Sequence, residues 1–281
     1  MTVLPQSITF MDLGRKQKTL YSAQVDTSAR NVVIKSAADI ELMREAGRIN
    51  ALALVTVRKF IHPGITTAEL NEAAETVIRE RGGLPAFLGY PGPYPYPATL
   101  NVSINNELVH GIPGKRRLRE GDIVSVDCGT IYKGFIGDSA FTVGVGCISE
   151  EAQRLIDVTR RALDEGIAKM RNGNRVGDVS NAIQRCVESK SYHVPREYTG
   201  HGVGRQLHEG PTVPNYGKPG RGLKLCPGMT IALEPMVLVG SPRTRVLADH
   251  WTVSSENGKL TAHFEHTVLV TEDDPVILTI L

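Results

Sequence analysis

The sequence predicts an α/β fold of the α+β kind, with two pseudo-symmetric halves that share an antiparallel sheet covered by helices. The first observation is composition, because 281 residues with 41% hydrophobic and 22% charged side chains are typical of a globular chain with a sizeable core. The second is an internal repeat in which both halves follow the order helix, helix, strands. We expect the halves to cover about 36–146 and 149–281.

The first half begins with two predicted helices. Ser36 and Asp39 form an S-x-x-D capping box, and apolar residues then recur at i, i+3 and i+4 as far as Val57. This spacing indicates a helix with one buried face. Thr66 and Glu69 form another capping box ahead of a shorter periodic stretch, which predicts a second helix.

The second half repeats this pair of helices. Ser149 begins the longer one, with Glu150 and Glu151 at the positive end of the helix dipole. The shorter one aligns with its counterpart without a gap, so that Glu69 corresponds to Asp178 and the apolar positions agree in phase. Both halves are therefore expected to place two helices ahead of their strands.

Each half also contains two short β-type runs that carry an acidic residue. The run 121–127 and its counterpart 228–234 each begin at a glycine and end in a carboxylate. The run 138–143 and its counterpart 265–270 each begin with a carboxylate. The repeat thus groups four acids into one set: Asp127, Asp138, Glu234 and Glu265.

The four acids are expected to meet at the axis that relates the halves. A turn centred on 132–133 places Asp127 opposite Asp138, and a bulge nearby would shift this register by a residue or two. Facing like charges on apolar strands require a cation, a shared proton or a basic partner. Pseudo-symmetry brings Glu234 and Glu265 to the same axis, and two divalent cations would neutralise all four.

Histidines in glycine-rich loops extend the pattern. His110 lies in HGIPG and His201 in GHGVG, so each half places a histidine ahead of its two acids, and His208 follows in LHEGP. Imidazole with oxygen ligands suits Mn, Fe, Co or Zn. A two-metal site of this kind activates a water and polarises a carbonyl, so we expect hydrolysis of an amide or ester.

Charge and composition argue against other classes. A net charge of +2 does not favour binding of nucleic acid through bulk charge, and no apolar run approaches the ~18 residues of a membrane span. The four cysteines lack metal or redox spacing. The N-terminal stretch lacks the order of a secretory signal, and residues 1–30 stand outside the repeat as an expected extension. We expect a cytoplasmic monomer with no direct nucleic-acid site.

At these residues the chain resembles the type I methionine aminopeptidases, a family of pita-bread metallopeptidases. The resemblance rests on HGIPG at 110–114, on GHGVG and LHEGP within 200–211, and on five ligand-type residues in the family's order. These five are Asp127, Asp138, His201, Glu234 and Glu265. The resemblance covers about 31–281, which is the expected catalytic domain, and it implies the pita-bread fold.

The resemblance also implies that the chain binds two divalent metal ions. The candidate ions are Co, Mn, Fe, Zn and Ni, all of which tolerate oxygen and imidazole ligands. Asp127 would bind one ion, and His201 and Glu234 the other. Asp138 and Glu265 would bridge the two. The implied reaction is removal of the initiator methionine from nascent polypeptides when the second residue is small.

Further roles follow from the same resemblance. Glu234 would act as a proton shuttle for the attacking water. His110 and His208 would contact the scissile amide and stabilise the tetrahedral intermediate without binding metal, because neutral imidazoles can donate hydrogen bonds where negative charge develops. The free α-amino group would bind near the metal that His110 faces. The expected partners are nascent polypeptide N-termini and the ribosome.

The expected methionine pocket differs from that of many bacterial members of the family. Those members have Cys at the positions that Phe87 and Asn101 occupy in this chain, and the loop between the two positions is shorter in them. In this chain the loop contains the Pro/Tyr-rich stretch 90–97. This stretch is equally compatible with a pocket rim and with a rigid surface loop. The candidate substrate-binding residues, besides the two histidines, are Phe87, Tyr90, Tyr96, Asn101 and Trp251.

Two alternatives remain beside a methionine aminopeptidase. A peptidase of the prolidase or aminopeptidase P type would share the fold, but those relatives usually have an additional N-terminal domain, which residues 1–30 cannot form. The short interval between His201 and Glu234 argues against type II members, which carry a helical insertion there. A metal-free peptide- or ribosome-binding module is the second alternative, and such proteins typically lose ligands that this chain retains.

Overall fold

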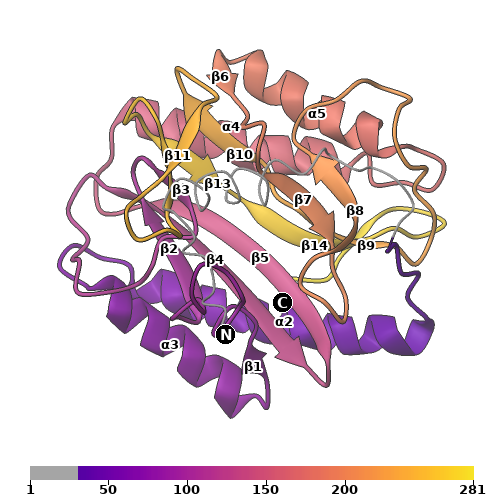
Figure 1. Ribbon diagram of the computed structural model, residues 1–281, viewed down its shortest axis with the longest axis horizontal. Coiled ribbons are helices and arrows are strands. Elements are labelled where there is room, and N and C mark those ends of the chain that lie inside the picture. The colour runs from indigo at the N-terminus through magenta and orange to yellow at the C-terminus, as the bar shows by residue number, and fades with distance from the viewer. Residues whose placement is uncertain (1–30) are drawn as a thin grey trace, which may run out of the picture.

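An antiparallel sheet runs through the molecule and contains strands from both halves of the chain (Figure 1). The computed structural model describes residues 31–281, so the expectation for residues 1–30 lies outside the described residues. The nine strands of the sheet are β1 (Leu84–Pro85), β2 (Leu100–Ile104), β4 (Ile123–Tyr132), β5 (Phe135–Gly144), β7 (Thr199–Gly202), β8 (Glu209–Pro214), β9 (Thr230–Leu233), β14 (Glu265–Leu269) and β15 (Val276–Ile277). Their order is β1-β4-β5-β14-β9-β7-β8, with β2 paired to β4 and β15 to β14. The two halves join where β5 pairs with β14.

Two smaller sheets of three strands extend the β-structure. One has the order β13 (Thr261–His263), β10 (Met236–Val239), β6 (Tyr192–His193), and the other has β11 (Thr244–Val246), β12 (Val253–Ser255), β3 (Glu107–Val109). The β10–β13 pair continues the register of the β9–β14 pair, because Met236 faces His263 just as Leu233 faces His266. The two pairs therefore form one long antiparallel ladder.

The helices come from the two halves in equal number within residues 31–281, as the repeat predicts. They are α2 (Ala37–Phe60), α3 (Thr67–Glu80), α4 (Glu150–Ile167) and α5 (Val176–Glu188). In Figure 1 α2 and α3 lie at the lower side of the sheet, and α4 and α5 lie at the upper side. Across residues 31–281, none of the helices combines the length and apolar character needed to cross a membrane.

The predicted helix starts are confirmed. The Ser36 side chain accepts from the backbone N–H of Asp39, and the Asp39 carboxylate accepts in return from the Ser36 backbone. Thr66 and Glu69 form the same reciprocal pair at the start of α3. Ser149 caps α4 through its hydroxyl. These caps satisfy backbone donors that a helix start leaves unpaired, which is why they locate the helices so well.

The helices of each half pack on strands to form two separate apolar cores. In the first half, α2 and α3 cover β2 and β4 through a buried cluster that includes Ile49, Val57, Leu70, Ile78, Val102 and Val124. In the second half, α4 and α5 cover β9 and β13 through a cluster that includes Leu155, Ile183, Ile231, Leu233 and Ala262. Each core fixes its own strands, so the acids on those strands are carried by rigid elements.

The predicted register of the first hairpin was wrong by two residues. The turn occupies Lys133 and Gly134, whose φ values of 46° and 82° suit the two central positions of a tight hairpin turn. Asp127 consequently pairs with Ala140, and Asp138 pairs with Gly129. The two acids are diagonal neighbours on one face of the hairpin and do not stand directly opposite each other.

Candidate metal centre

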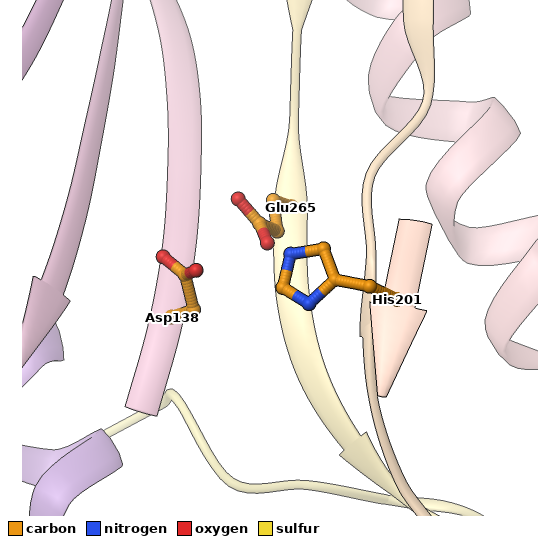
Figure 2. Close-up of side chains that lie close together, drawn as sticks. All are labelled: Asp138, His201 and Glu265. Carbon is orange, nitrogen blue, oxygen red and sulfur yellow. The ribbon is translucent and has the colours of Figure 1, made fainter. Parts of the chain in front are cut away.

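Three side chains from three strands converge where the two halves of the sheet meet (Figure 2). Asp138 lies on β5, Glu265 on β14 and His201 on β7, and one candidate ligand atom of each lies within 4.8 Å of the others. All three residues are buried. They are three of the five expected metal ligands.

The strand register brings the other two acids beside them. Asp127 and Glu265 both pair with Ala140, so they lie in one row across β4, β5 and β14. One position beyond the end of β9, Glu234 comes opposite Glu265. Asp138 belongs to the neighbouring row on the same face, because side chains two residues apart point the same way. The small side chain of Ala140 leaves space between the carboxylates.

Direct contacts tie the cluster together. His201 Nε2 lies 3.5 Å from Glu234 Oε1, while its Nδ1 lies 3.0 Å from the carbonyl oxygen of the next residue. Asp127 and Asp138 are diagonal neighbours on the hairpin, and each carboxyl group affects the pKa of the other. Asn101, one of the expected substrate-binding residues, donates from Nδ2 to Asp127 Oδ2 at 2.8 Å. The structure thus brings all five expected ligands together.

Ionising all four acids of this cluster without a bound cation is energetically unfavourable. Burial raises the pKa of Asp127 to about 7. Burial and the neighbouring carboxylates raise the pKa values of Asp138, Glu234 and Glu265 well above their usual range. Burial also lowers the pKa of His201 to about 3, so its imidazole is neutral near pH 7 and can donate a lone pair. The site therefore favours either bound protons or bound cations.

The residues fit divalent cations. Three buried oxygen atoms of the cluster have no hydrogen-bond partner, namely Asp127 Oδ1, Asp138 Oδ1 and Glu265 Oε1. Within the described part of the chain, no lysine or arginine forms an ion pair with any of the four acids, and the basic side chains beside them are the imidazoles of His201 and His263. Unpartnered carboxylate oxygens beside a neutral imidazole are the donor set that Mn, Fe, Co or Zn ions accept.

His110 approaches the centre from the end of β3 in an unusual conformation. Its φ of +60° is uncommon for a residue other than glycine, and such backbone geometry often marks functional sites. The next residue, Gly111, is held by hydrogen bonds to Val102, Ser103 and Tyr96, and a Cβ there would lie 2.3 Å from the Val102 carbonyl oxygen. Burial lowers the pKa of His110 to about 4, and its Nδ1 has no partner. A neutral imidazole is thus available to a ligand.

His208 lies beside His201 at the edge of the cluster. Its ring centroid is 4.3 Å from that of His201, and its Nδ1 is 2.7 Å from the hydroxyl oxygen of Tyr90. The Tyr90 contact orients the ring and leaves Nε2 for another group. His208 thus lies directly beside one ligand-type residue, and neither His110 nor His208 belongs to the tight group of Asp138, His201 and Glu265.

The remaining candidate substrate residues form an aromatic wall. Phe87, Tyr96 and Trp251 are buried in one apolar cluster, and the partly buried Tyr90 packs against it. The Trp251 ring lies 5.1 Å from that of Tyr96. Gly92 lets the loop 90–97 pack closely on this wall, because a Cβ there would lie 2.3 Å from the indole ring. The loop is therefore part of the packing around Trp251.

One buried histidine of the site was not predicted. His263 Nε2 lies 3.6 Å from Glu234 Oε2 and 3.8 Å from Glu265 Oε2, and burial lowers the pKa of its imidazole to about 3. The available signal was position, since His263 precedes Glu265 by two residues and alternation along a strand places both on one face. The predicted strand began at Glu265, so His263 was left outside it.

A separate groove of about 1630 Å³ lies along α4 and α5. Its lining mixes both charge signs, with Arg154, Arg161, Asp164 and Lys190 among the contributors. None of the five ligand-type residues lines it. The chemistry-bearing side chains are thus concentrated at the sheet junction.

Comparisons with known proteins bear on the family of the chain. A family model for metallopeptidase family M24 matches residues 41–272. The chain is 47% identical to the methionine aminopeptidase of Clostridium perfringens over 89% of its own length and 99% of that protein. It is also 47% identical to methionine aminopeptidase 1 of Bacillus subtilis, covering 88% of this chain and 99% of that one.

Solved structures show the same similarity. A methionine aminopeptidase from Thermotoga maritima matches with a TM-score of 0.87 and 46% identity, over 89% of this chain and all of that one. A prolidase from Pyrococcus horikoshii matches with a TM-score of 0.72 at 22% identity, over 88% of this chain and 63% of that one. The prolidase shares the fold, which is the predicted pita-bread arrangement.

Proposed function

This chain belongs to metallopeptidase family M24, among the type I methionine aminopeptidases, and we propose that its clustered carboxylate and imidazole side chains hold two divalent ions for the removal of N-terminal methionine. The observation that supports the ions most directly is the set of buried carboxylate oxygens without hydrogen-bond partners. Three of the four acids contribute such an oxygen, and the four carboxylates, which have no lysine or arginine partner among residues 31–281, need positive charge to ionise together.

The positions of the side chains support the ligand roles that the resemblance implies. Asp127, which stands at the first-half side of the cluster, would hold one ion. His201 and Glu234, which contact each other on the second-half side, would hold the other. Asp138 and Glu265 come from the two central strands, β5 and β14, and would contribute to both ions.

Divalent ions in such a site lower the pKa of a water molecule and polarise the scissile carbonyl. Glu234 takes a proton from the attacking water and passes it to the leaving amine, a transfer that a carboxylate beside the reacting atoms can perform. His110 and His208 donate hydrogen bonds to the substrate where negative charge develops on the carbonyl oxygen. The Tyr90 hydroxyl keeps the His208 ring in the orientation that this requires.

The aromatic wall binds the methionine side chain. Phe87, Tyr96 and Trp251 supply apolar surface, and Tyr90 lies at its edge. Asn101 acts through Asp127, whose carboxylate it orients. The free α-amino group of the substrate binds on the side that His110 faces, and a small second residue is required. The substrates are N-termini of nascent polypeptides, so we place this monomer in the cytoplasm, close to the ribosome.

A peptide assay tests this function. Chelator-stripped protein is incubated with Met-Ala-Ser, Met-Leu-Ser and Ala-Pro-Ser, with and without added Mn²⁺ or Co²⁺. We expect release of methionine from Met-Ala-Ser alone, and only with metal. Cleavage of Ala-Pro-Ser alone would assign the chain to the proline-specific peptidases, and a folded protein that cleaves nothing with any metal would favour a binding module.

A further inference from the structure

Glu234 lies between two imidazoles, and we propose that the second of them, His263, is a positioning residue of the metal centre. His201 Nε2 lies 3.5 Å from Oε1 of Glu234, and His263 Nε2 lies 3.6 Å from Oε2 of the same carboxylate. His201 is an expected ligand, whereas His263 has no assigned role. The inference rests on the proposed two-ion site and concerns how one of its ligands is oriented.

The backbone around His263 is fixed by the sheet. Its strand β13 pairs with β10, and this pair continues the ladder that carries Glu234 and Glu265. The Thr142 hydroxyl accepts from the His263 N–H at 2.9 Å and donates to the His263 carbonyl oxygen at 2.7 Å. Ser125 Oγ lies 2.8 Å from that hydroxyl. The imidazole is therefore carried by a rigid strand.

The Nε2 atom of the side chain faces the two glutamates. His263 is 1% exposed, and neither ring nitrogen has a hydrogen-bond partner within residues 31–281. Buried polar atoms are normally satisfied, so an imidazole enclosed at this position indicates a partner that forms in the working site. Two carboxylate oxygens lie within 4 Å of Nε2, namely Glu234 Oε2 at 3.6 Å and Glu265 Oε2 at 3.8 Å.

A hydrogen bond from His263 Nε2–H to Glu234 Oε2 would restrain that carboxylate. With Oε2 restrained, Oε1 stays on the side of His201, where both can bind the same ion. Carboxylates that bind metal are commonly held by such outer hydrogen bonds, and removing one typically weakens metal binding by about 10–100-fold. His263 thus sets the affinity of the ion that His201 and Glu234 share.

Two amide substitutions test this role as a matched pair. His263→Gln places an N–H near the position of Nε2, whereas the shorter side chain of His263→Asn places it near Nδ1 and leaves Glu234 without a donor. His263→Leu supplies an apolar comparison in case the Asn variant does not fold, which thermal melting reveals. Mn²⁺ binding is measured by isothermal titration calorimetry of the full chain, and the Co²⁺-loaded proteins are compared by visible absorption.

The expected result is that His263→Gln retains the wild-type Mn²⁺ affinities and Co²⁺ spectrum. His263→Asn and His263→Leu should weaken one of the two ions by about 10–100-fold and alter the Co²⁺ bands. The inference is overturned if the Asn or Leu variant binds both ions as the wild type does, or if Gln behaves like Leu. Wild-type protein that binds no Mn²⁺ would instead overturn the proposed function, and this inference with it.

Discussion

Removing one partner of the buried ion pair between Lys35 and Glu209 should lower the stability of the protein substantially. Lys35 Nζ lies 2.5 Å from Glu209 Oε2, and the two side chains are only 2% and 5% exposed. Replacing Lys35 with Met removes the cation and leaves a buried carboxylate. Removal of one partner from such a pair typically costs 3–5 kcal/mol, far more than the ~0–1 kcal/mol of an exposed pair.

The contacts of Glu209 indicate that the stability lost on removing Lys35 lies at the lower end of the 3–5 kcal/mol range. Glu209 Oε1 also accepts from the backbone N–H groups of Arg205 and Gln206 at 2.8 and 3.2 Å, so the orphaned carboxylate keeps two donors. We therefore expect Lys35→Met to lower the free energy of unfolding by about 3 kcal/mol. This corresponds to a melting temperature roughly 6–12 °C lower for a chain of this size.

The assay is thermal and urea unfolding of the metal-free protein at pH 7. The double variant Lys35→Met with Glu209→Gln should recover most of the loss, because a neutral amide oxygen still accepts from the two backbone donors. Arg160→Met, which breaks an exposed pair with Asp157, is the matched control and should change stability by less than about 1 kcal/mol. The reasoning is refuted if Lys35→Met is no less stable than this control.

Three further predictions concern the site. Above about pH 7 imidazoles are neutral in both the folded and the unfolded chain, whereas the folded carboxylate cluster, with the pKa of Asp127 raised to about 7 and those of the other three acids raised well above their usual range, still binds protons more tightly. Metal-free protein should therefore lose stability as the pH rises above about 7; Mn²⁺ should abolish this trend in melting curves, and a melt without metal that does not change over this range would contradict it. Tyr90→Phe removes the hydrogen bond to His208 and should lower kcat about 3–10-fold, while elemental analysis should find the metal content unchanged. An unchanged kcat would show that Tyr90 does not orient the His208 ring. Gly92→Ala forces a Cβ against Trp251, so the KM for Met-Ala-Ser should rise and the free energy of unfolding should fall by about 1–3 kcal/mol. An unchanged KM would show that the loop 90–97 does not contribute to substrate binding.

Local signals in the sequence were sufficient to locate the helices. Ser36, Thr66 and Ser149 each satisfy a backbone donor through their own hydroxyl, so the residue type and the structural role coincide. The same holds for the repeat, which grouped the four acids because equivalent strands in the two halves carry them. Such features depend on a few neighbouring residues and can be predicted without the tertiary structure.

Features that depend on pairing between distant segments were harder to predict. The hairpin register was missed because the turn lies at Lys133-Gly134, one position beyond the expected centre, and one residue of turn position shifts the pairing by two. The hydrogen bond from Asn101 to Asp127 was not predicted, because it depends on the pairing of β2 with β4. His263 joins the site only through the ladder that links β13 to β14.

Counting the Mn²⁺ ions bound per chain decides whether the carboxylate cluster is a two-ion site. Chelator-stripped wild-type protein is dialysed against Mn²⁺ and analysed for metal, beside Asp138→Asn and the control Asp157→Asn, which alters an exposed acid on α4. We expect two ions per chain in the wild type and in the control, and fewer in Asp138→Asn, because Asp138 is proposed to contribute to both ions. Two ions in Asp138→Asn, or none in the wild type, would show that the cluster is not this site.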